Sequence, residues 1–201
     1  MELVDDGCDV IFADSFGHES HLLKAAKEAP DVQFAHATGT MAHTEKLDNF
    51  SNAFASIYEG RYLAGVAAGM KLKEMEEAGE LKTKNYSGEN IKIGYVGAFS
   101  YAEVISGYTS FYLGVKSVVE NVVMDVQFTD SWYDEAKERE AALALIESGC
   151  ALISQHADSW GAPMACEEKG VPNVSYNGNT SSKCPETAII SSAIKVGAKR
   201  S

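Results

Sequence analysis

The stretch GCDVIFADSFG at residues 7–17 returns in altered form as GCALISQHADSWG at residues 149–161. Both copies begin with Gly-Cys, continue as a short apolar run and end in Ala-Asp-Ser-aromatic-Gly. In each copy an Ala-containing stretch with Lys and Glu follows, and then a proline and another apolar run. Two copies this far apart are too few for a solenoid, and they indicate two similar α/β lobes.

Short apolar runs alternate with amphipathic stretches along the chain, which is typical of βα units and a mainly parallel sheet. The pattern predicts strands over 8–13, 32–37, 91–97, 122–128, 150–155, 172–176 and 187–191. It predicts helices over 18–29, 54–78, 102–120, 134–148 and 160–169. Ser131 and Asp134 resemble a capping box for the fourth of these helices, and Gly149 ends it. Small residues in the second helix predict close packing of that helix on a sheet.

A domain boundary is expected near residue 90, because residues 71–90 lose apolar periodicity and gain charge, Gly and Asn. The predicted organisation is a first lobe over 1–90, a second lobe over 91–186 and a return segment over 187–201. In an alternative interpretation, residues 71–82 are the solvated end of a long helix and the crossing lies at 84–90.

The 201 residues carry 17 Lys and Arg against 29 Asp and Glu, a net charge of −12. This balance argues against a nucleic-acid partner and against electrostatic binding to anionic membranes. An apolar content of 45% is enough for a core, so disorder is not expected. No window approaches the roughly 18 consecutive apolar residues of a membrane span. Residues 1–17 lack a basic region and a long apolar region, so no signal peptide is predicted in this chain.

The cysteines Cys8, Cys150, Cys166 and Cys184 lie far apart and show no zinc-ligand spacing. Free structural thiols are the favoured interpretation, and one disulfide is the alternative.

The sequence declares no catalytic constellation. His18 and His21 lie three residues apart without an evident third ligand, so no metal site is expected. The segment Gly94–Gly97 does not form a GxGxxG fingerprint, and a Walker lysine motif and a GxSxG elbow are both missing. A binding protein without a cofactor is therefore favoured over an enzyme.

Ligands of open parallel sheets bind outside the carboxyl ends of the strands. Four predicted loops lie there: the two Ala-Asp-Ser-aromatic-Gly loops, residues 129–134 and residues 177–179. Aromatic faces stack on planar rings, and Ser, Asp and Asn pair with hydroxyls, so a nucleoside or sugar-like solute is the expected ligand. The candidate ligand-binding residues of these loops are Ser15, Phe16, Trp132, Asp158, Trp160, Asn177 and Asn179.

Each candidate also has a purely structural interpretation. The serines of these loops suit helix N-caps. Phe16 and Trp160 suit lids over the core. Asn177 and Asn179 flank Gly178 and suit a turn, because Asn tolerates left-handed backbone.

Four blocks of the sequence carry a family resemblance. They are residues 7–39, FASIYEGRYLAGVAAGMKLKE at 54–74, IKIGYVGAFSYAEVISGYTSFYLGVKSV at 91–118, and DSWYDEAKEREAALALIESGCALISQHAD at 130–158. Together they resemble the basic membrane protein family of bacterial ABC-transporter substrate-binding lipoproteins, which includes purine nucleoside receptors.

This resemblance implies a type I periplasmic-binding-protein fold, with two α/β lobes around a cleft that captures a nucleoside-like molecule. Trp132 matches the aromatic that stacks on the nucleobase. Asn177 stands where many members have a ribose-binding aspartate. Lys195 matches a lysine of the return segment that reaches the ligand, and Phe16 falls in the loop that lines the cleft.

The resemblance also implies an ABC permease as partner and an extracytoplasmic location through a lipid anchor. The family's lipoprotein signal and first strand–loop–helix are not found in this sequence, so we expect a chain shortened at both ends with an incomplete first lobe. A ligand-sensing regulatory domain of the same fold is one alternative function. An α/β enzyme acting on a sugar or nucleoside is another.

Overall fold

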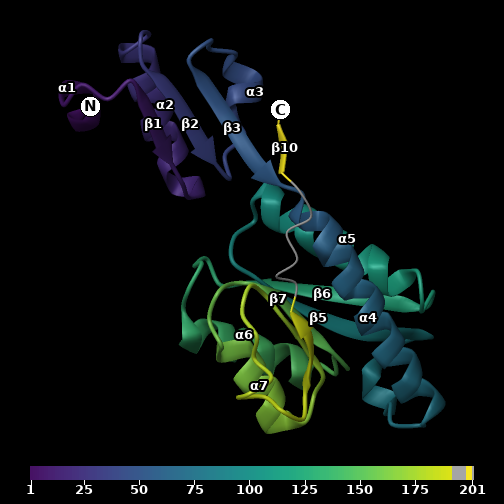
Figure 1. Ribbon diagram of the computed structural model, residues 1–201. Helices are drawn as coiled ribbons and strands as arrows, with labels where there is room; N and C mark the ends of the chain where they lie inside the picture. The colour runs from purple at the N-terminus through teal and green to yellow at the C-terminus, as the bar shows by residue number, and fades with distance from the viewer. Residues whose placement is uncertain (192–197, 201) are drawn as a thin grey trace. The chain divides into compact units, whose positions relative to one another are not determined.

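The computed structural model describes residues 1–191 and 198–200, which form two compact units (Figure 1). Unit 1 comprises Met1–Ser56 and the C-terminal segment, and unit 2 comprises Ile57–Ile194. The division at Ser56 differs from the expected boundary near residue 90. The reason is that α4 (Ile57–Glu77), which begins after Ser56, packs against the next helix of unit 2. Residues 71–77 are therefore the end of this helix, and residues 78–82 lie beyond it.

Unit 1 has a four-stranded sheet with the order β1-β2-β3-β10. β1 to β3 are parallel, and β10 pairs with β3 in antiparallel fashion. Its elements are α1 (Glu2–Asp5), β1 (Val10–Ala13), η1 (Phe16–His18), α2 (Glu19–Glu28), β2 (Gln33–Ala37), α3 (Met41–Glu45), β3 (Phe50–Ala55) and β10 (Ala198–Arg200). β3 was not predicted, because its buried positions alternate Phe50 with the polar Asn52 and so hide the apolar pattern.

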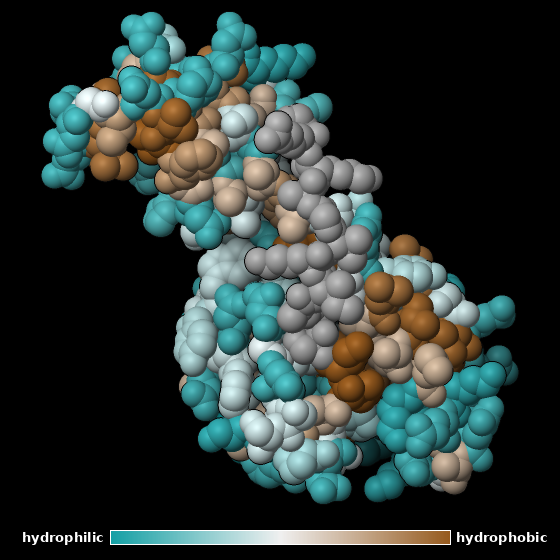
Figure 2. Space-filling model, in the orientation of Figure 1, coloured by the Kyte–Doolittle hydropathy of each residue, from teal (hydrophilic) through white to brown (hydrophobic). Residues whose placement is uncertain are grey.

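The two faces of the unit 1 sheet differ in burial. Ile11, Phe34 and Phe50 are buried against α2 and form the core of this unit. On the opposite face Val10 and Phe12 are exposed, and hydrophobic side chains gather over these strands in Figure 2. The core of unit 1 therefore lies on one side of its sheet.

Unit 2 is a βα sheet of six strands in the described residues, with the order β4-β5-β7-β8-β9 and with β6 also paired to β5. All pairings are parallel except that of β4 with β5. Its elements are α4 (Ile57–Glu77), η2 (Thr83–Asn85), β4 (Tyr86–Ser87), β5 (Asn90–Gly97), α5 (Ala102–Lys116), β6 (Val122–Phe128), α6 (Glu135–Glu147), β7 (Ile153–His156), α7 (Gly161–Lys169), β8 (Asn173–Ser175) and β9 (Ala188–Ser191).

Helices cover both faces of the unit 2 sheet, α4 and α5 on one side and α6 and α7 on the other (Figure 1). Tyr95 and Phe111 lie in the core beneath α4 and α5, whereas Leu145 and Ile153 lie in the core beneath α6 and α7. Parallel strands buried on both faces are expected to be almost continuously apolar, as the run of β5 is.

The small residues of α4 serve two kinds of packing. Ala64 and Ala68 are buried in the core with residues of the sheet, as predicted, whereas the glycines allow close helix-on-helix packing. A Cβ added at Gly65 would collide with the backbone oxygen of Phe111, and one added at Gly114 would collide with that of Tyr62. Glycine at both positions lets the backbones of α4 and α5 meet directly.

Helix α6 begins one residue later than predicted and uses a different cap. The Asp134 side chain accepts the backbone N–H of Lys137 at 3.0 Å, so Asp134 and not Ser131 is the N-cap. The four cysteines are free thiols, as the favoured interpretation had it. Within the part of the chain that the structure describes, no helix is long and apolar enough to cross a membrane.

Candidate functional site

Aromatic and polar side chains gather where the unit 2 strands end. They follow β5, β6, β7 and β8, or begin the helix after β5, and so lie along one edge of a parallel sheet. We call this group the carboxyl-edge cluster, and it consists of Phe99, Tyr101, Glu103, Trp132, His156, Asp158, Tyr176 and Asn177.

Trp132 is the centre of the aromatic part of the cluster. Its ring centroid lies 5.6 Å from that of Phe99 and 6.4 Å from those of Tyr101 and His156. Phe99 and Tyr101 stack on one another at 4.9 Å with an interplanar angle of 12°. Trp132 and Phe99 are half-buried and Tyr101 is exposed, so the group presents ring surface to solvent.

The polar part of the cluster joins three loops. The backbone N–H of Asp158 donates to the carbonyl of Trp132 at 2.7 Å, and the Asn177 side-chain amide donates to the Asp158 carboxylate at 3.2 Å. Burial raises the pKa of the Asp158 carboxyl, although the bond from Asn177 favours its charged form. Asn177 has a φ of 57°, a left-handed turn conformation. The structure thus brings Trp132, Asp158 and Asn177 together.

A buried polar network lies behind the rings. The guanidinium of Arg61 donates to the hydroxyls of Tyr95 at 2.6 Å and of Ser154 at 2.9 Å. The Tyr95 hydroxyl lies 3.4 Å from Nδ1 of His156, and the His156 ring lies 4.3 Å from that of Tyr176. Burial lowers the pKa of His156, so its imidazole is neutral at neutral pH.

Two further side chains fix the loops. The Glu138 carboxylate on α6 accepts the backbone N–H groups of Asp134 and Ser159 at 3.2 Å. The Gln155 amide donates to the carbonyls of Ala157 and Ser159 at 2.6 and 2.9 Å. Because these bonds are buried, the loops after β6 and β7 are held in one arrangement.

Trp160 and Asn179 are not part of the carboxyl-edge cluster. Trp160 lines a cavity of about 360 Å³ together with Tyr133, Met164 and Lys183. Asn179 accepts the backbone N–H of Ser181 at 3.0 Å and so closes a local turn. The structure therefore favours the turn interpretation for Asn179.

Ser15 and Phe16 belong to unit 1 and follow β1. Ser15 has a φ of 76°, and its carbonyl lies 2.9 Å from Nε2 of the buried His36. Strained backbone of this kind clusters at functional sites. A cavity of about 680 Å³ lies over the open face of the same sheet, but its lining is mostly small and apolar. Lys195 lies outside the described residues.

The sequence reasoning missed Glu103, His156, Tyr176 and the two aromatics after β5. His156 was findable, since it precedes the Ala-Asp-Ser-aromatic-Gly loop directly. Glu103 had no such signal, because one Glu in the first turn of a helix is ordinary. In the described residues, His, Cys, Asp and Glu side chains form no group of three that could hold a metal ion.

Ligands of parallel α/β sheets bind at the carboxyl edge, where this aromatic and polar cluster lies, and solute-binding proteins are one class with this arrangement. The model of the Bmp family, described as ABC transporter substrate-binding protein PnrA-like, matches residues 1–200. The chain belongs to this family.

Two curated relatives are equally similar to this chain. A putative ABC transporter glucose-binding protein of Haloferax volcanii is 37% identical over 84% of this chain and 38% of its own length. A purine-binding protein of Brucella abortus is 37% identical over 82% of this chain and 41% of its own length. This chain thus spans about two fifths of the length of these relatives.

The solved structures support the fold. An ABC transporter solute-binding protein of Aeropyrum pernix matches with a TM-score of 0.72 at 18% identity, over 91% of this chain and 50% of that one. At this identity the likeness shows the fold alone, which is an α/β periplasmic-binding-protein fold with parallel sheets flanked by helices.

Proposed function

We propose that the full-length protein is the substrate-binding component of an ABC importer and that it binds a purine base or nucleoside at the carboxyl-edge cluster. The main observation in support of this ligand is the half-buried Trp132 ring, which packs against Phe99 and Tyr101. It lies beside Asp158 and Asn177, whose side chains are hydrogen-bonded to one another. A planar base stacks on such rings, and ribose hydroxyls pair with a carboxylate and an amide.

The names of the two relatives point to different ligands, glucose and purine. We favour a purine because three neighbouring aromatic rings offer more flat surface than a single sugar ring covers. The polar partners are correspondingly few, which fits a ligand held mainly by ring contact.

The test is a titration of the full-length protein with adenine, adenosine, uridine and glucose, followed by calorimetry and by tryptophan fluorescence. This chain contains two tryptophans, Trp132 and Trp160, so a Trp132→Phe variant identifies which quenching comes from the Trp132 ring. We expect saturable quenching of Trp132 by the purines. Binding of glucose alone, or of none of the four, would overturn the ligand assignment.

A matched pair of variants tests the place of binding. Trp132→Ala should weaken purine binding about 5- to 150-fold, the range for loss of about 1–3 kcal/mol of base stacking. Tyr62→Ala serves as the control, because Tyr62 is an exposed aromatic residue on α4 outside the carboxyl-edge cluster. Equal losses in both variants would contradict stacking on Trp132.

The remaining parts of the proposal follow from family membership. The protein delivers its ligand to an ABC permease and is held outside the cytoplasm by a lipid anchor. Phe16, Ser15, Trp160, Asn179 and Lys195 stay predicted ligand contacts. A Phe16→Ala variant with unchanged purine affinity would show that Phe16 is not a ligand contact.

A further inference from the structure

We propose that Glu103 is a further ligand-contacting residue of the carboxyl-edge cluster, that it selects ligands presenting N–H donors, and that His156 is the positioning residue for its carboxylate. This inference rests on the proposed function, because it needs a nucleobase on Trp132. The inference adds a selection between nucleobases by the polar groups attached to their rings.

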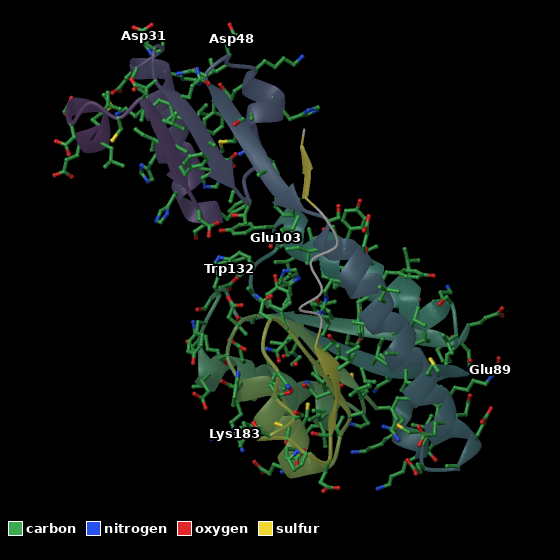
Figure 3. The ribbon with its side chains drawn as sticks, in the orientation of Figure 1. Asp31, Asp48, Glu89, Glu103, Trp132 and Lys183 are labelled. Carbon is green, nitrogen blue, oxygen red and sulfur yellow. The ribbon has the colours of Figure 1, made fainter. Side chains whose placement is uncertain are left out.

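Glu103 lies at the same carboxyl edge of the unit 2 sheet as Trp132 (Figure 3). It is in the first turn of α5, two residues after Tyr101, and its side chain is 10% exposed. Its carboxylate lies 3.6 Å from Nε2 of His156, whose ring is also a neighbour of Trp132. Figure 3 labels Glu103 and Trp132 at the same end of unit 2.

The buried hydrogen bonds of Arg61 and Tyr95 determine which ring nitrogen of His156 carries the proton. The Tyr95 hydroxyl oxygen accepts from Arg61, so its own proton is available to Nδ1 of His156. The neutral imidazole then carries its proton on Nε2, an assignment that follows from the network. That nitrogen is fully buried and has no hydrogen-bond partner within the described part of the chain, because Glu103 stands slightly beyond bonding distance.

The charges around His156 keep Glu103 available to a ligand. The titratable and charged groups that face His156 are Arg61, Tyr95, Glu103, Asp158 and Tyr176, from five different elements or loops. Burial is the main cause that lowers the pKa of His156, and the Arg61 charge lowers it further, whereas Glu103 raises it. The neutral ring orients the Glu103 carboxylate without forming a full ion pair. The carboxylate can therefore still accept a charge-assisted hydrogen bond.

A carboxylate only accepts hydrogen bonds, so it discriminates between ligand edges. An exocyclic amine donates to it, whereas a carbonyl oxygen at the same place would face a negative charge. The raised pKa of Asp158 does not change this conclusion, because its carboxyl is occupied by Asn177. Discrimination through such a repulsive contact is strong relative to discrimination by shape.

The experiment compares adenosine with purine riboside, which has the same ring system and ribose but lacks the exocyclic amine. We expect wild-type protein to bind adenosine at least about tenfold more tightly, as loss of one charged hydrogen bond predicts. Glu103→Gln should bring the two dissociation constants within about threefold. The control Glu89→Gln changes an exposed carboxylate elsewhere on unit 2 and should preserve the preference (Figure 3).

The role of His156 has its own readout. In the wild type, adenosine affinity should fall as acidification protonates His156 and pairs it with Glu103. His156→Gln, whose amide can still donate an N–H toward Glu103, should remove this pH dependence and keep the preference for adenosine, whereas His156→Ala should reduce the preference. A pH profile unchanged in His156→Gln would overturn the positioning role.

The outcomes separate this inference from the proposed function. Wild-type protein that binds neither nucleoside overturns both. Wild-type protein that binds both nucleosides equally overturns the role of Glu103 alone, and this result does not depend on the folding of any variant. A folded Glu103→Gln that keeps the full preference, checked by circular dichroism, also overturns it.

Discussion

The carboxylate of Glu138 accepts the backbone N–H of Ser159 through both of its oxygens, each at 3.2 Å. It also accepts the N–H of Asp134, so one buried side chain on α6 joins the loops that carry Trp132 and Asp158. The stability of unit 2 and the shape of the candidate site therefore depend on the same residue.

Glu138→Ala should lower the free energy of unfolding of unit 2 by about 1–3 kcal/mol, because it leaves buried N–H groups without an acceptor. Urea unfolding followed by tryptophan fluorescence measures this, since both tryptophans lie in unit 2. Glu140→Ala is the matched control, an exposed residue on the same helix. Similar urea midpoints for Glu138→Ala and Glu140→Ala would contradict the stabilising role of the Glu138 carboxylate.

Gly65→Ala should destabilise unit 2 by about 1–3 kcal/mol, the usual cost of overpacking. The added Cβ would meet the backbone oxygen of Phe111, which cannot turn away as a side chain can. The same unfolding experiment measures the loss. Met70→Ala, an exposed position on the same helix, should change stability by less than about 0.5 kcal/mol. A Gly65→Ala variant with an unchanged free energy of unfolding would mean that α4 and α5 are further apart than described.

The stability of unit 2 should fall as pH drops below about 6.5, the ordinary pKa of histidine. The folded-state pKa of His156 is lowered, so the folded state binds fewer protons and stability is lost on acidification through this window. The loss amounts to at most about 1.4 kcal/mol per pH unit. His156 is the only histidine of unit 2, since the other four lie before residue 57.

His156→Gln should flatten this dependence between pH 5.5 and about 7.5 when unfolding is followed by tryptophan fluorescence. Asp158 acts with the opposite sign at lower pH. Its raised folded-state pKa means that stability is lost as pH rises from about 3.9 to the raised value. A slope that persists in His156→Gln would assign the effect to carboxyl groups.

Asn49→Asp should destabilise unit 1. The Asn49 amide donates to the carbonyls of Ala26, Ala29 and Val32 at 2.9, 3.1 and 3.0 Å, and a carboxylate would face three acceptors instead. Hydrogen-exchange mass spectrometry should show faster exchange over 26–34, with little change in unit 2. Asp48→Asn, an exposed neighbour, is the control. Equal exchange in both variants would contradict this role.

Much of unit 2 could be predicted because its elements are locally encoded. The 122–128 strand was predicted with its observed bounds, and α6 within one residue, since apolar periodicity and terminal glycine signals agree there. β3 and the antiparallel β10 in unit 1 could not be predicted. Their positions depend on neighbours far away in the sequence, and Asn52 interrupts the apolar pattern of β3.

The candidate site divides in the same way. The structure brings Trp132, Asp158 and Asn177 together, and the sequence could single them out because each follows a predicted strand in a loop with characteristic residues. Their contact with a ligand stays a prediction. Trp160 was grouped with Trp132 on the same reasoning, yet it lines a separate cavity. A sequence tells which residues follow a strand, but it does not tell which way each side chain turns.

By itself the sequence determined the α/β class, the repeated strand–loop–helix unit and the family, because these depend on local patterns and shared motifs. Only the tertiary structure decided that α4 belongs to unit 2 and that Gly65 meets Phe111. It also decided that Arg61, Tyr95, His156 and Glu103 form one network. These four residues lie on four different elements, and only the packing of two helices across two strands brings each of them within 4 Å of the next.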